Sequence, residues 1–334
     1  MKIRKSTIGN LDLAQGSSAL GSARWWESDS ASFSSYASAV QVETKLQPAF
    51  ADVSALFSSA TYRNLASSRP LDALERLARV APLARASGAE SIADVFDAAY
   101  STLLRGYRNE YVFKNAIVSK IVFGRHRPTT ASAILELPLG ESIADVAVFN
   151  GTSTVYEIKT DLDSFGRLAS QMRDYTTRIE RVNVVVSDRR AATAERHIPE
   201  RIGLLALRRN GALGVIRPAG SNLAHMRSDH IFGILRTREV EDILAALGRH
   251  VNAADPVQHW HQLRTLFSDL SVDDAHEGAV RTLRTRGLGA ADIASHPALP
   301  KSARALAYSA ALSNIAKRRL VNRFLQPLPP AWGH

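Results

Sequence analysis

Two acidic residues in the middle of the chain could together hold a metal ion, beside which a lysine could orient the attacking water or stabilise the transition state. Asp145 lies in the segment ESIADVAVFNG, and Glu157 and Lys159 lie in STVYEIKTD. Both segments are short and β-rich, which predicts two strands. Because successive side chains of a strand point to opposite faces, Glu157 and Lys159 are expected on one face and Tyr156 and Ile158 on the other.

The turn between the two predicted strands should bring the carboxylates together. Asn150 and Gly151 separate the strands, and this dipeptide is typical of a tight hairpin turn. Asp145 and Glu157 would then converge at one end of the sheet, where two carboxylates suit a hard cation such as Mg²⁺ or Mn²⁺. The backbone carbonyl of Ile158 is a further expected ligand. Such a metal would activate water for attack on phosphorus.

An alternative explains Glu157 and Lys159 without chemistry. They would be an exposed pair on an edge strand, contributing little to stability. Val155, Tyr156 and Ile158 argue against it, because they indicate that both faces of the strand are covered. Buried charge without a partner or a metal is costly.

The surrounding pattern predicts the elements that position these residues. Helical periodicity over 91–124 precedes a first strand at 133–139 and the two strands at 144–150 and 153–160. A helix over 164–180 follows, with Asp163 or Ser164 as its N-cap. A buried strand at 182–187, a short helix at 191–200 and strands at 202–209 and 213–218 come next.

Helical segments flank this α/β core on both sides. We expect three regions: a Ser-rich segment with helices at 1–104, the core at 105–218 and a helical region at 219–334. Residues 17–38 are interpreted as a loop or linker whose Trp25 and Trp26 dock against other residues. The C-terminal helices are expected at 232–250, 256–270, 278–287 and 300–325.

The motif resembles that of a known superfamily. Asp145 followed by Glu157-Ile158-Lys159 across a hairpin is similar to the signature of the PD-(D/E)XK (restriction-endonuclease-like) superfamily, although Ala144 stands where the motif's name has proline. The resemblance implies an α/β fold with a three-layer α/β/α core and a mixed central sheet. More narrowly, residues 105–210 resemble an uncharacterised bacterial group of nuclease-like proteins.

The resemblance also implies further site residues. Glu110 in GYRNEYVFKN matches the acidic residue on the preceding helix, which would be an auxiliary acid and metal ligand. Gln171 and Tyr175 in QMRDY match a Gln-x-x-x-Tyr pair of one branch of the superfamily. Alternatives stay open: Glu110 could simply pair with Lys114 at i, i+4, and Gln171 and Tyr175 could be a helix-surface residue and a core aromatic.

The charge of the chain favours an anionic partner. The formal net charge is +10 and the pI is about 10.1, which favours a polyanion such as DNA or RNA. Phosphate contacts near the core would give salt-sensitive binding that does not depend on sequence. The arginines expected to make them are Arg125, Arg127, Arg167, Arg173 and Arg178.

Several classes of chemistry are excluded. The chain has no cysteine, so it has no disulfide, thiolate zinc site or cysteine nucleophile. It also has no HExxH motif, Gly-rich phosphate loop or Gly-x-Ser-x-Gly elbow. No apolar h-region follows the N-terminus and no apolar run is long enough to span a bilayer, so we expect a cytoplasmic protein without a membrane partner; the resemblance to the bacterial group implies a bacterial one.

The leading functional hypothesis is a Mg²⁺- or Mn²⁺-dependent nuclease. It would hydrolyse phosphodiester bonds in DNA, as an endonuclease rather than an exonuclease, in defence against foreign DNA or in repair; RNA is the alternative substrate. The helical flanks would select the nucleic acid, bind a protein partner or build a homodimer. The second hypothesis is a nuclease-fold module that binds nucleic acid or protein with weak or no cleavage.

Overall fold

The computed structural model describes residues 50–332. The linker expected at 17–38, with Trp25 and Trp26, lies outside the described residues. Among the helices that are described, none is long and apolar enough to cross a membrane.

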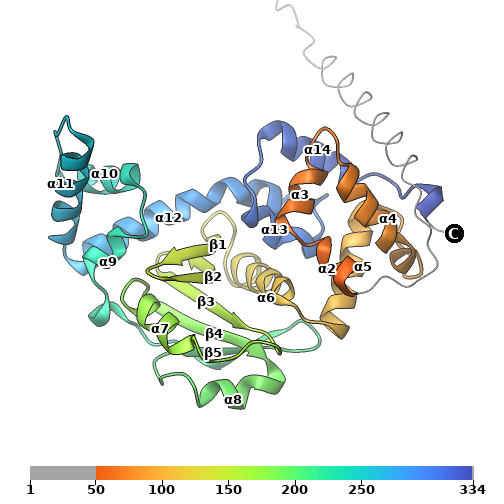
Figure 1. The fold of residues 1–334 in the computed structure, drawn as a ribbon, viewed down its shortest axis with the longest axis horizontal. Coiled ribbons are helices and arrows are strands. Elements are labelled where there is room, and N and C mark those ends of the chain that lie inside the picture. Colours follow the sequence, from red (N-terminus) through yellow and green to blue (C-terminus); the bar gives the residue numbers. More distant parts are fainter. Residues whose placement is uncertain (1–49, 333–334) are drawn as a thin grey trace, which may run out of the picture.

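A six-stranded mixed sheet forms the centre of the protein (Figure 1). The strands lie side by side in chain order. The first three are antiparallel to one another, β3, β4 and β5 are parallel, and β6 is antiparallel to β5. Their bounds are β1 (Ser132–Leu139), β2 (Ser142–Phe149), β3 (Ser153–Lys159), β4 (Arg181–Ser187), β5 (Gly203–Leu207) and β6 (Leu213–Arg217).

The β2–β3 hairpin has the expected turn. Gly151 has φ +96°, a left-handed conformation that glycine adopts without strain, and the N–H of Asn150 donates to the carbonyl of Thr152 at 3.1 Å. Every residue of β3 is buried, and the strand lies between β2 and β4. The alternative of an exposed pair on an edge strand is therefore wrong.

Helices cover both faces of the sheet. The helix α6 (Glu110–Ile117), continued by the π-helical η1 (Val118–Arg125), packs on β2 and β3. On the other face, α7 (Leu168–Thr176) packs on β2 and β4, and α8 (Ala191–Glu195), after η2 (Asp188–Arg190), packs on β4 and β5. Tyr156 and Ile158 belong to the hydrophobic cluster on the α6 side, and Val155 belongs to the cluster on the α7 side. The mixed α/β architecture predicted from the sequence is confirmed.

The helix after β3 begins later than the sequence predicts. Arg167 precedes its first residue, and no side chain caps its N-terminus. Asp163 instead accepts hydrogen bonds from the backbone N–H and the hydroxyl of Thr160, both at 2.7 Å. The prediction of Asp163 or Ser164 as the cap is wrong, because Asp163 stabilises the end of β3 rather than the start of α7.

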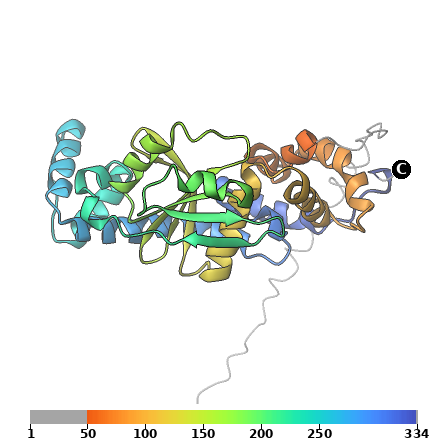
Figure 2. The same ribbon diagram turned by 90° about the horizontal axis from the view of Figure 1, so that it is seen from below.

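The N-terminal helices pack beside the sheet against C-terminal residues 293–332, whereas the helices between 228 and 268 lie at the opposite end of the protein (Figures 1 and 2). Phe96 and Phe324, from the two regions, have ring centroids 5.2 Å apart. The N-terminal helices are α2 (Phe50–Ala55), α3 (Ser59–Leu65), α4 (Leu71–Arg85) and α5 (Ile92–Gly106). The C-terminal elements are η3 (Leu223–His225), α9 (Ser228–Phe232), α10 (Thr237–Ala246), α11 (Pro256–Ser268), α12 (Val272–Ala294), η4 (Lys301–Ala303), α13 (Arg304–Ser309), α14 (Asn314–Phe324) and η5 (Pro330–Trp332).

Two C-terminal helices differ from the sequence prediction. The helix expected at 278–287 is the middle of the longer α12, which packs along β1 and β2 despite three internal glycines. The helix expected at 300–325 is divided into η4, α13 and α14, because the backbone at Ala310 is extended (φ −143°, ψ 116°).

Candidate functional site

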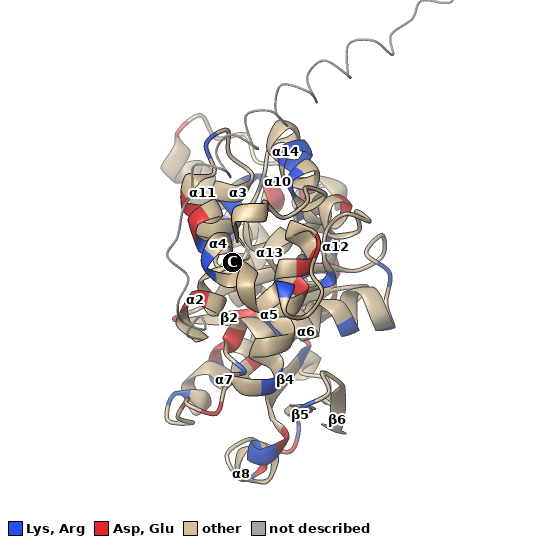
Figure 3. Cartoon of the chain, turned by 90° about the vertical axis from the view of Figure 1, so that its right-hand side faces the viewer, with Lys and Arg blue, Asp and Glu red and all other residues tan. Residues whose placement is uncertain are grey.

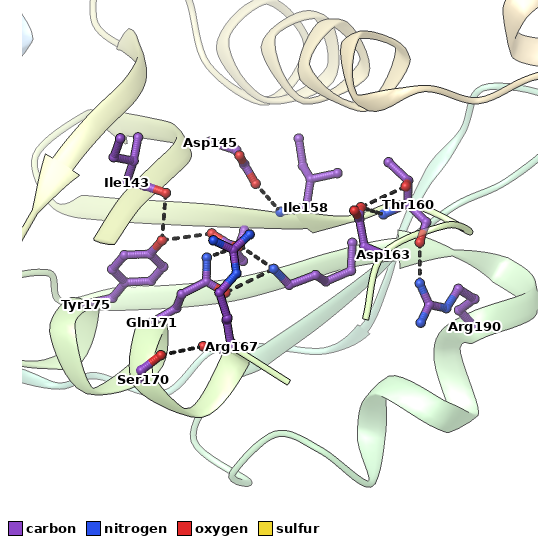
Figure 4. A network of polar contacts seen from close by, with 12 residues as sticks. Ile143, Asp145, Ile158, Thr160, Asp163, Arg167, Ser170, Gln171, Tyr175 and Arg190 are labelled. Atoms are coloured by element: carbon purple, nitrogen blue, oxygen red, sulfur yellow. Dashed lines mark hydrogen bonds and ion pairs between the residues drawn. The ribbon is translucent and has the colours of Figure 1, made fainter. Parts of the chain in front are cut away.

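Glu157 lies at the centre of a buried polar cluster at the end of β3 (Figure 4). Its Oε1 accepts from Lys159 Nζ at 2.7 Å and from Gln171 Nε2 at 2.6 Å, and its Oε2 accepts from the Tyr175 hydroxyl at 2.9 Å. Glu157 is 2% exposed and Lys159 6%. Two opposite charges are thus held in a site with little water, where electrostatic interactions are stronger than at the surface.

Gln171 and Tyr175 reach this cluster because they are four residues apart on α7 and share one face of the helix. The Gln171 amide donates to Glu157 and its Oε1 accepts from Lys159 Nζ at 3.0 Å, so it connects the two charges. Tyr175 is fully buried, and its hydroxyl also lies 2.9 Å from the carbonyl of Ile143. Burial and the charge of Glu157 raise the pKa of Tyr175 far above its usual range, so the hydroxyl stays a donor. Tyr175 is both a core aromatic and a polar contact of Glu157.

Asp145 lies beside Glu157 at the end of the hairpin away from the Asn150-Gly151 turn. The last recorded pair of β2 and β3 is Val146 with Tyr156, so the next position in the register brings Asp145 opposite Glu157. Asp145 Oδ2 accepts from the N–H of Ile158 at 2.6 Å. Burial, and next the negative charge of Glu157, raise the pKa of Asp145 to about 7. The expected convergence of the two carboxylates is present.

Glu110 lies at the rim of this cluster and makes the ion pair that the alternative predicted. Its Oε1 is 2.5 Å from Lys114 Nζ, one turn further along α6. Glu110 is exposed, and its charge also contributes to the raised pKa of Asp145. The two interpretations of Glu110 are therefore compatible.

Glu136 on β1 was missed by the sequence analysis. Lys114 also pairs with Glu136, at 3.1 Å. Glu136 has φ +54°, rare for a residue other than glycine, and the pairs on either side of it place it opposite Asp145. Only the strand register could have identified it, because a single glutamate in a strand carries no motif.

A cleft of about 410 Å³ opens at this end of the sheet. Its lining includes all the expected catalytic residues except the buried Tyr175. Of the five expected nucleic-acid-binding arginines, Arg167 alone lines this cleft. The lining residues are Glu110, Glu141, Ser142, Ile143, Asp145, Glu157, Ile158, Lys159, Asp163, Arg167, Ser170, Gln171 and Asp174.

The other four arginines do not gather around the cleft. Arg173 is exposed on α7, and Arg178 is held against α7 by a 2.8 Å hydrogen bond to the carbonyl of Asp174. Arg125 lines a different cavity together with Asn150 at the hairpin turn, and Arg127 follows two residues later. The hairpin turn is at the opposite end of β2 and β3 from Asp145, so Arg125 and Arg127 lie away from the candidate site.

The oxygen atoms at this site fit a hard divalent cation. Asp145 and Glu157 supply carboxylates, and Ile158 lies between Glu157 and Lys159 on the strand that reaches the cleft. No group of three or more His, Cys, Asp or Glu within residues 50–332 is arranged to hold a metal. The protein would therefore provide few ligands, as Mg²⁺ tolerates when water and phosphate oxygens complete the shell. A dication would also stabilise the ionised form of Asp145, whose pKa is raised to about 7 by burial and next by the charge of Glu157.

The fold and site define a mixed α/β protein with a buried carboxylate–lysine cluster at the end of its central strand. The chain belongs to the bacteriophage P4 protein cII family, whose model matches residues 105–289. Protein cII of Enterobacteria phage P4 is 24% identical over 146 residues, which cover 43% of this chain and 54% of that protein. The chain thus spans about half the length of the curated relative it matches. No solved structure matches it.

This match corrects the resemblance derived from the motif. The chain was expected to belong to the PD-(D/E)XK superfamily and to resemble a bacterial group of nuclease-like proteins. The family match is to phage P4 protein cII instead, and it begins at the first residue of the expected core and extends past it through most of α12. An Asp and a Glu-x-Lys on neighbouring strands are too few residues to establish common ancestry, because such short patterns recur by chance.

Proposed function

We propose that this protein hydrolyses phosphodiester bonds in DNA with Mg²⁺ or Mn²⁺ held at Asp145 and Glu157. One observation carries the proposal: two carboxylates line the same cleft, where burial and next the charge of Glu157 raise the pKa of Asp145 to about 7. Folding two acids against each other opposes stability, and such arrangements occur preferentially at functional sites. A dication and a phosphate would complete the charge balance.

Each residue of the cluster has a distinct role in this proposal. Asp145, Glu157 and the carbonyl of Ile158 would bind the metal, which when bound supplies positive charge and an acidified water. Lys159 is held by Glu157 and Gln171 at the cleft, and its ammonium group would stabilise charge on the phosphate oxygens. Glu110 would act as an auxiliary acid at the rim.

Gln171 and Tyr175 are positioning residues in this proposal. Their hydrogen bonds at 2.6 and 2.9 Å fix both oxygens of Glu157, and a catalytic group must be held within a fraction of an ångström of its productive position. The likeness of α6, β1–β3, α7 and β4 to a restriction-endonuclease-like core belongs to the proposal as architecture and implies no shared family. The proposal also includes cleavage within the DNA strand rather than from its ends, and a role in defence or repair.

The test is incubation of the purified chain with supercoiled, linear and single-stranded DNA, with and without Mg²⁺ or Mn²⁺. Asp145→Asn should abolish metal-dependent cleavage. Asp273→Asn removes an exposed carboxylate from α12 and serves as the matched control, which should cleave like the parent. Equal cleavage by Asp145→Asn and the parent would contradict the proposal.

A second function is favoured by the hydrogen bonding of Glu157. Lys159, Gln171 and Tyr175 already satisfy its two oxygens without a metal. The alternative is therefore a module that binds nucleic acid or a protein without cleaving. Calorimetry separates the two: Mg²⁺ or Mn²⁺ binding that disappears in Asp145→Asn supports the enzyme, and DNA binding without metal binding supports the module.

A further inference from the structure

A second cleft adjoins the candidate site. It has a volume of about 450 Å³ and shares Glu110 and Asp163 with the first cleft. Four segments border it: the α5–α6 turn at 105–110, the loop at 160–163 that follows β3, η2 at Arg189, and the β5–β6 turn at Arg209. A ligand that passes Glu110 and Asp163 would extend directly from one cleft into the other.

Two arginines of this second cleft have no acidic partner within residues 50–332. Arg108 pairs with Asp188 at 3.4 Å, and Arg189 pairs with Asp161. Arg105 and Arg209 are exposed, and neither forms an ion pair among the described residues. Two guanidinium groups are therefore available to an anionic ligand, next to a site proposed to act on phosphate.

The two backbone segments that carry these arginines contact each other. Gly211, in the β5–β6 turn, packs so closely on Leu104 of α5 that an added Cβ would lie 3.2 Å from that side chain. Arg108 Nη1 donates to the carbonyl of Leu207 at 2.8 Å, which ties the α5–α6 turn to the end of β5. Arg105 and Arg209 therefore project from two elements that contact each other.

Tyr107 adds an aromatic surface to the same cleft. Tyr107 is 39% exposed, and its ring centroid lies 5.7 Å from that of Phe50. An exposed aromatic ring beside unpaired arginines is the combination that binds unpaired bases by stacking and their backbone by charge. A duplex cannot offer a base to Tyr107, because its bases are stacked on one another.

We propose that this second cleft binds a single-stranded segment of DNA next to the phosphate that is cleaved. Arg105 and Arg209 would contact backbone phosphates, and Tyr107 would stack on a base. The position of the cut phosphate rests on the proposed function, whereas binding in the second cleft can be measured without cleavage.

The test uses the full chain, metal-free buffer with a chelator, and two probes: an oligodeoxythymidylate and its duplex with oligodeoxyadenylate. Arg105→Gln/Arg209→Gln should bind the single strand about tenfold more weakly. Each lost phosphate contact should also reduce the slope of log K against log salt by about 0.7. Arg76→Gln/Arg238→Gln removes two exposed arginines from α4 and α10 and is the charge-matched control. It should lose less than twofold.

Tyr107 is tested separately because the phenol ring, not the hydroxyl, is proposed to act. Tyr107→Phe should bind the single strand like the parent, and Tyr107→Leu should bind it several-fold more weakly. Neither change should alter binding of the duplex. Thermal melting of each variant within a few degrees of the parent excludes unfolding as the cause.

Two results would overturn the inference: equal losses in the cleft double variant and its control, or equal affinity of the parent for both probes. Asp145→Asn separates the two proposals. If the variant binds the single strand like the parent but the parent itself cleaves no DNA in any condition, the proposed function fails and the second cleft stands. If cleavage depends on Asp145 but the cleft variants bind normally, the reverse holds.

Discussion

Lys159 Nζ lies 2.7 Å from Glu157 Oε1, two residues away on the same face of β3, and both side chains are buried. A buried charge that loses its partner is strongly destabilising, whereas loss of both charges is often tolerated. Glu157→Gln and Lys159→Met should therefore each lower the free energy of unfolding by about 3–5 kcal/mol.

The double variant Glu157→Gln/Lys159→Met should be more stable than the sum of the single changes predicts. Urea unfolding of all four proteins provides this comparison, and simple additivity would show that the two charges do not interact. Cleavage should be lost in all three variants, because the proposed site needs both groups. Activity and stability thus respond differently to the double change.

Asp145 should make the stability of the protein depend on pH. Its pKa is about 7 in the folded state against 3.8 for a free side chain, so the folded state binds the proton more tightly than the unfolded state. Stability from this group is complete below about pH 4 and is lost as the pH rises through about 7. The loss reaches about 4 kcal/mol, at roughly 1.4 kcal/mol per pKa unit.

Asp145→Asn removes this titration. Relative to the parent, it should gain stability between about pH 4 and 7 and show no further gain above that range. Mg²⁺ binds the ionised carboxylate, so it should raise the melting temperature of the parent more at pH 8 than at pH 6. If the stability of the parent and of the variant changed in parallel over this pH range, Asp145 would not have a raised pKa in the folded protein.

Tyr175→Phe separates packing from polar contact. The ring fills a fully buried position on α7, and the substitution retains it while removing the hydroxyl that contacts Glu157 and the carbonyl of Ile143. Stability should fall by about 1–3 kcal/mol, because buried acceptors lose their donor. Cleavage should fall more than DNA binding does. An unchanged cleavage rate would make Tyr175 a core aromatic without a role in positioning.

The arginines near the core should differ in their importance. Arg167 lines the candidate cleft, whereas Arg125 lies beside the hairpin turn at the other end of the strands. Arg167→Gln should weaken DNA binding and reduce the slope of log K against log salt by the amount expected for about one phosphate contact. Arg125→Gln should change neither the affinity nor the slope appreciably. Basic side chains are dispersed among acidic ones over the helices (Figure 3), so removing any one charge far from the site is a fair control. Equal effects of the two substitutions would argue against a localised DNA surface.

The contact of α12 with the sheet gives a test of packing with an internal control. A Cβ at Gly287 would lie 1.8 Å from Ser132 Oγ and 2.8 Å from the carbonyl of Ala133, whereas a Cβ at Gly289 would meet nothing within 4 Å. Gly287→Ala should therefore destabilise the fold by about 1–3 kcal/mol. Gly289→Ala should stabilise it by up to about 1 kcal/mol through helix propensity. Similar effects of both would contradict the close packing of α12 on β1.

Local patterns in the sequence predicted much of the core. The alternation in β3, the Asn150-Gly151 turn and the four-residue spacing of Gln171 and Tyr175 each depend on neighbours in the chain. These patterns were sufficient to predict that Asp145 approaches Glu157 across a hairpin. They failed where a competing partner decided the outcome, as for Asp163, whose carboxylate binds Thr160 instead of capping α7.

Contacts between distant segments could be decided only by the tertiary structure. That Arg105 and Arg209 line one cleft depends on how the α5 helix packs on the β5–β6 turn, and Glu136 is placed opposite Asp145 only by strand register. The raised pKa of Asp145 arises from burial and neighbouring charge, which no spacing in the chain records. The sequence by itself determined which residues are of types that could carry chemistry and the faces they share, because a strand or a helix has a fixed period. The tertiary structure decided which of them meet and at what charge, because that depends on the packing of elements far apart in the chain.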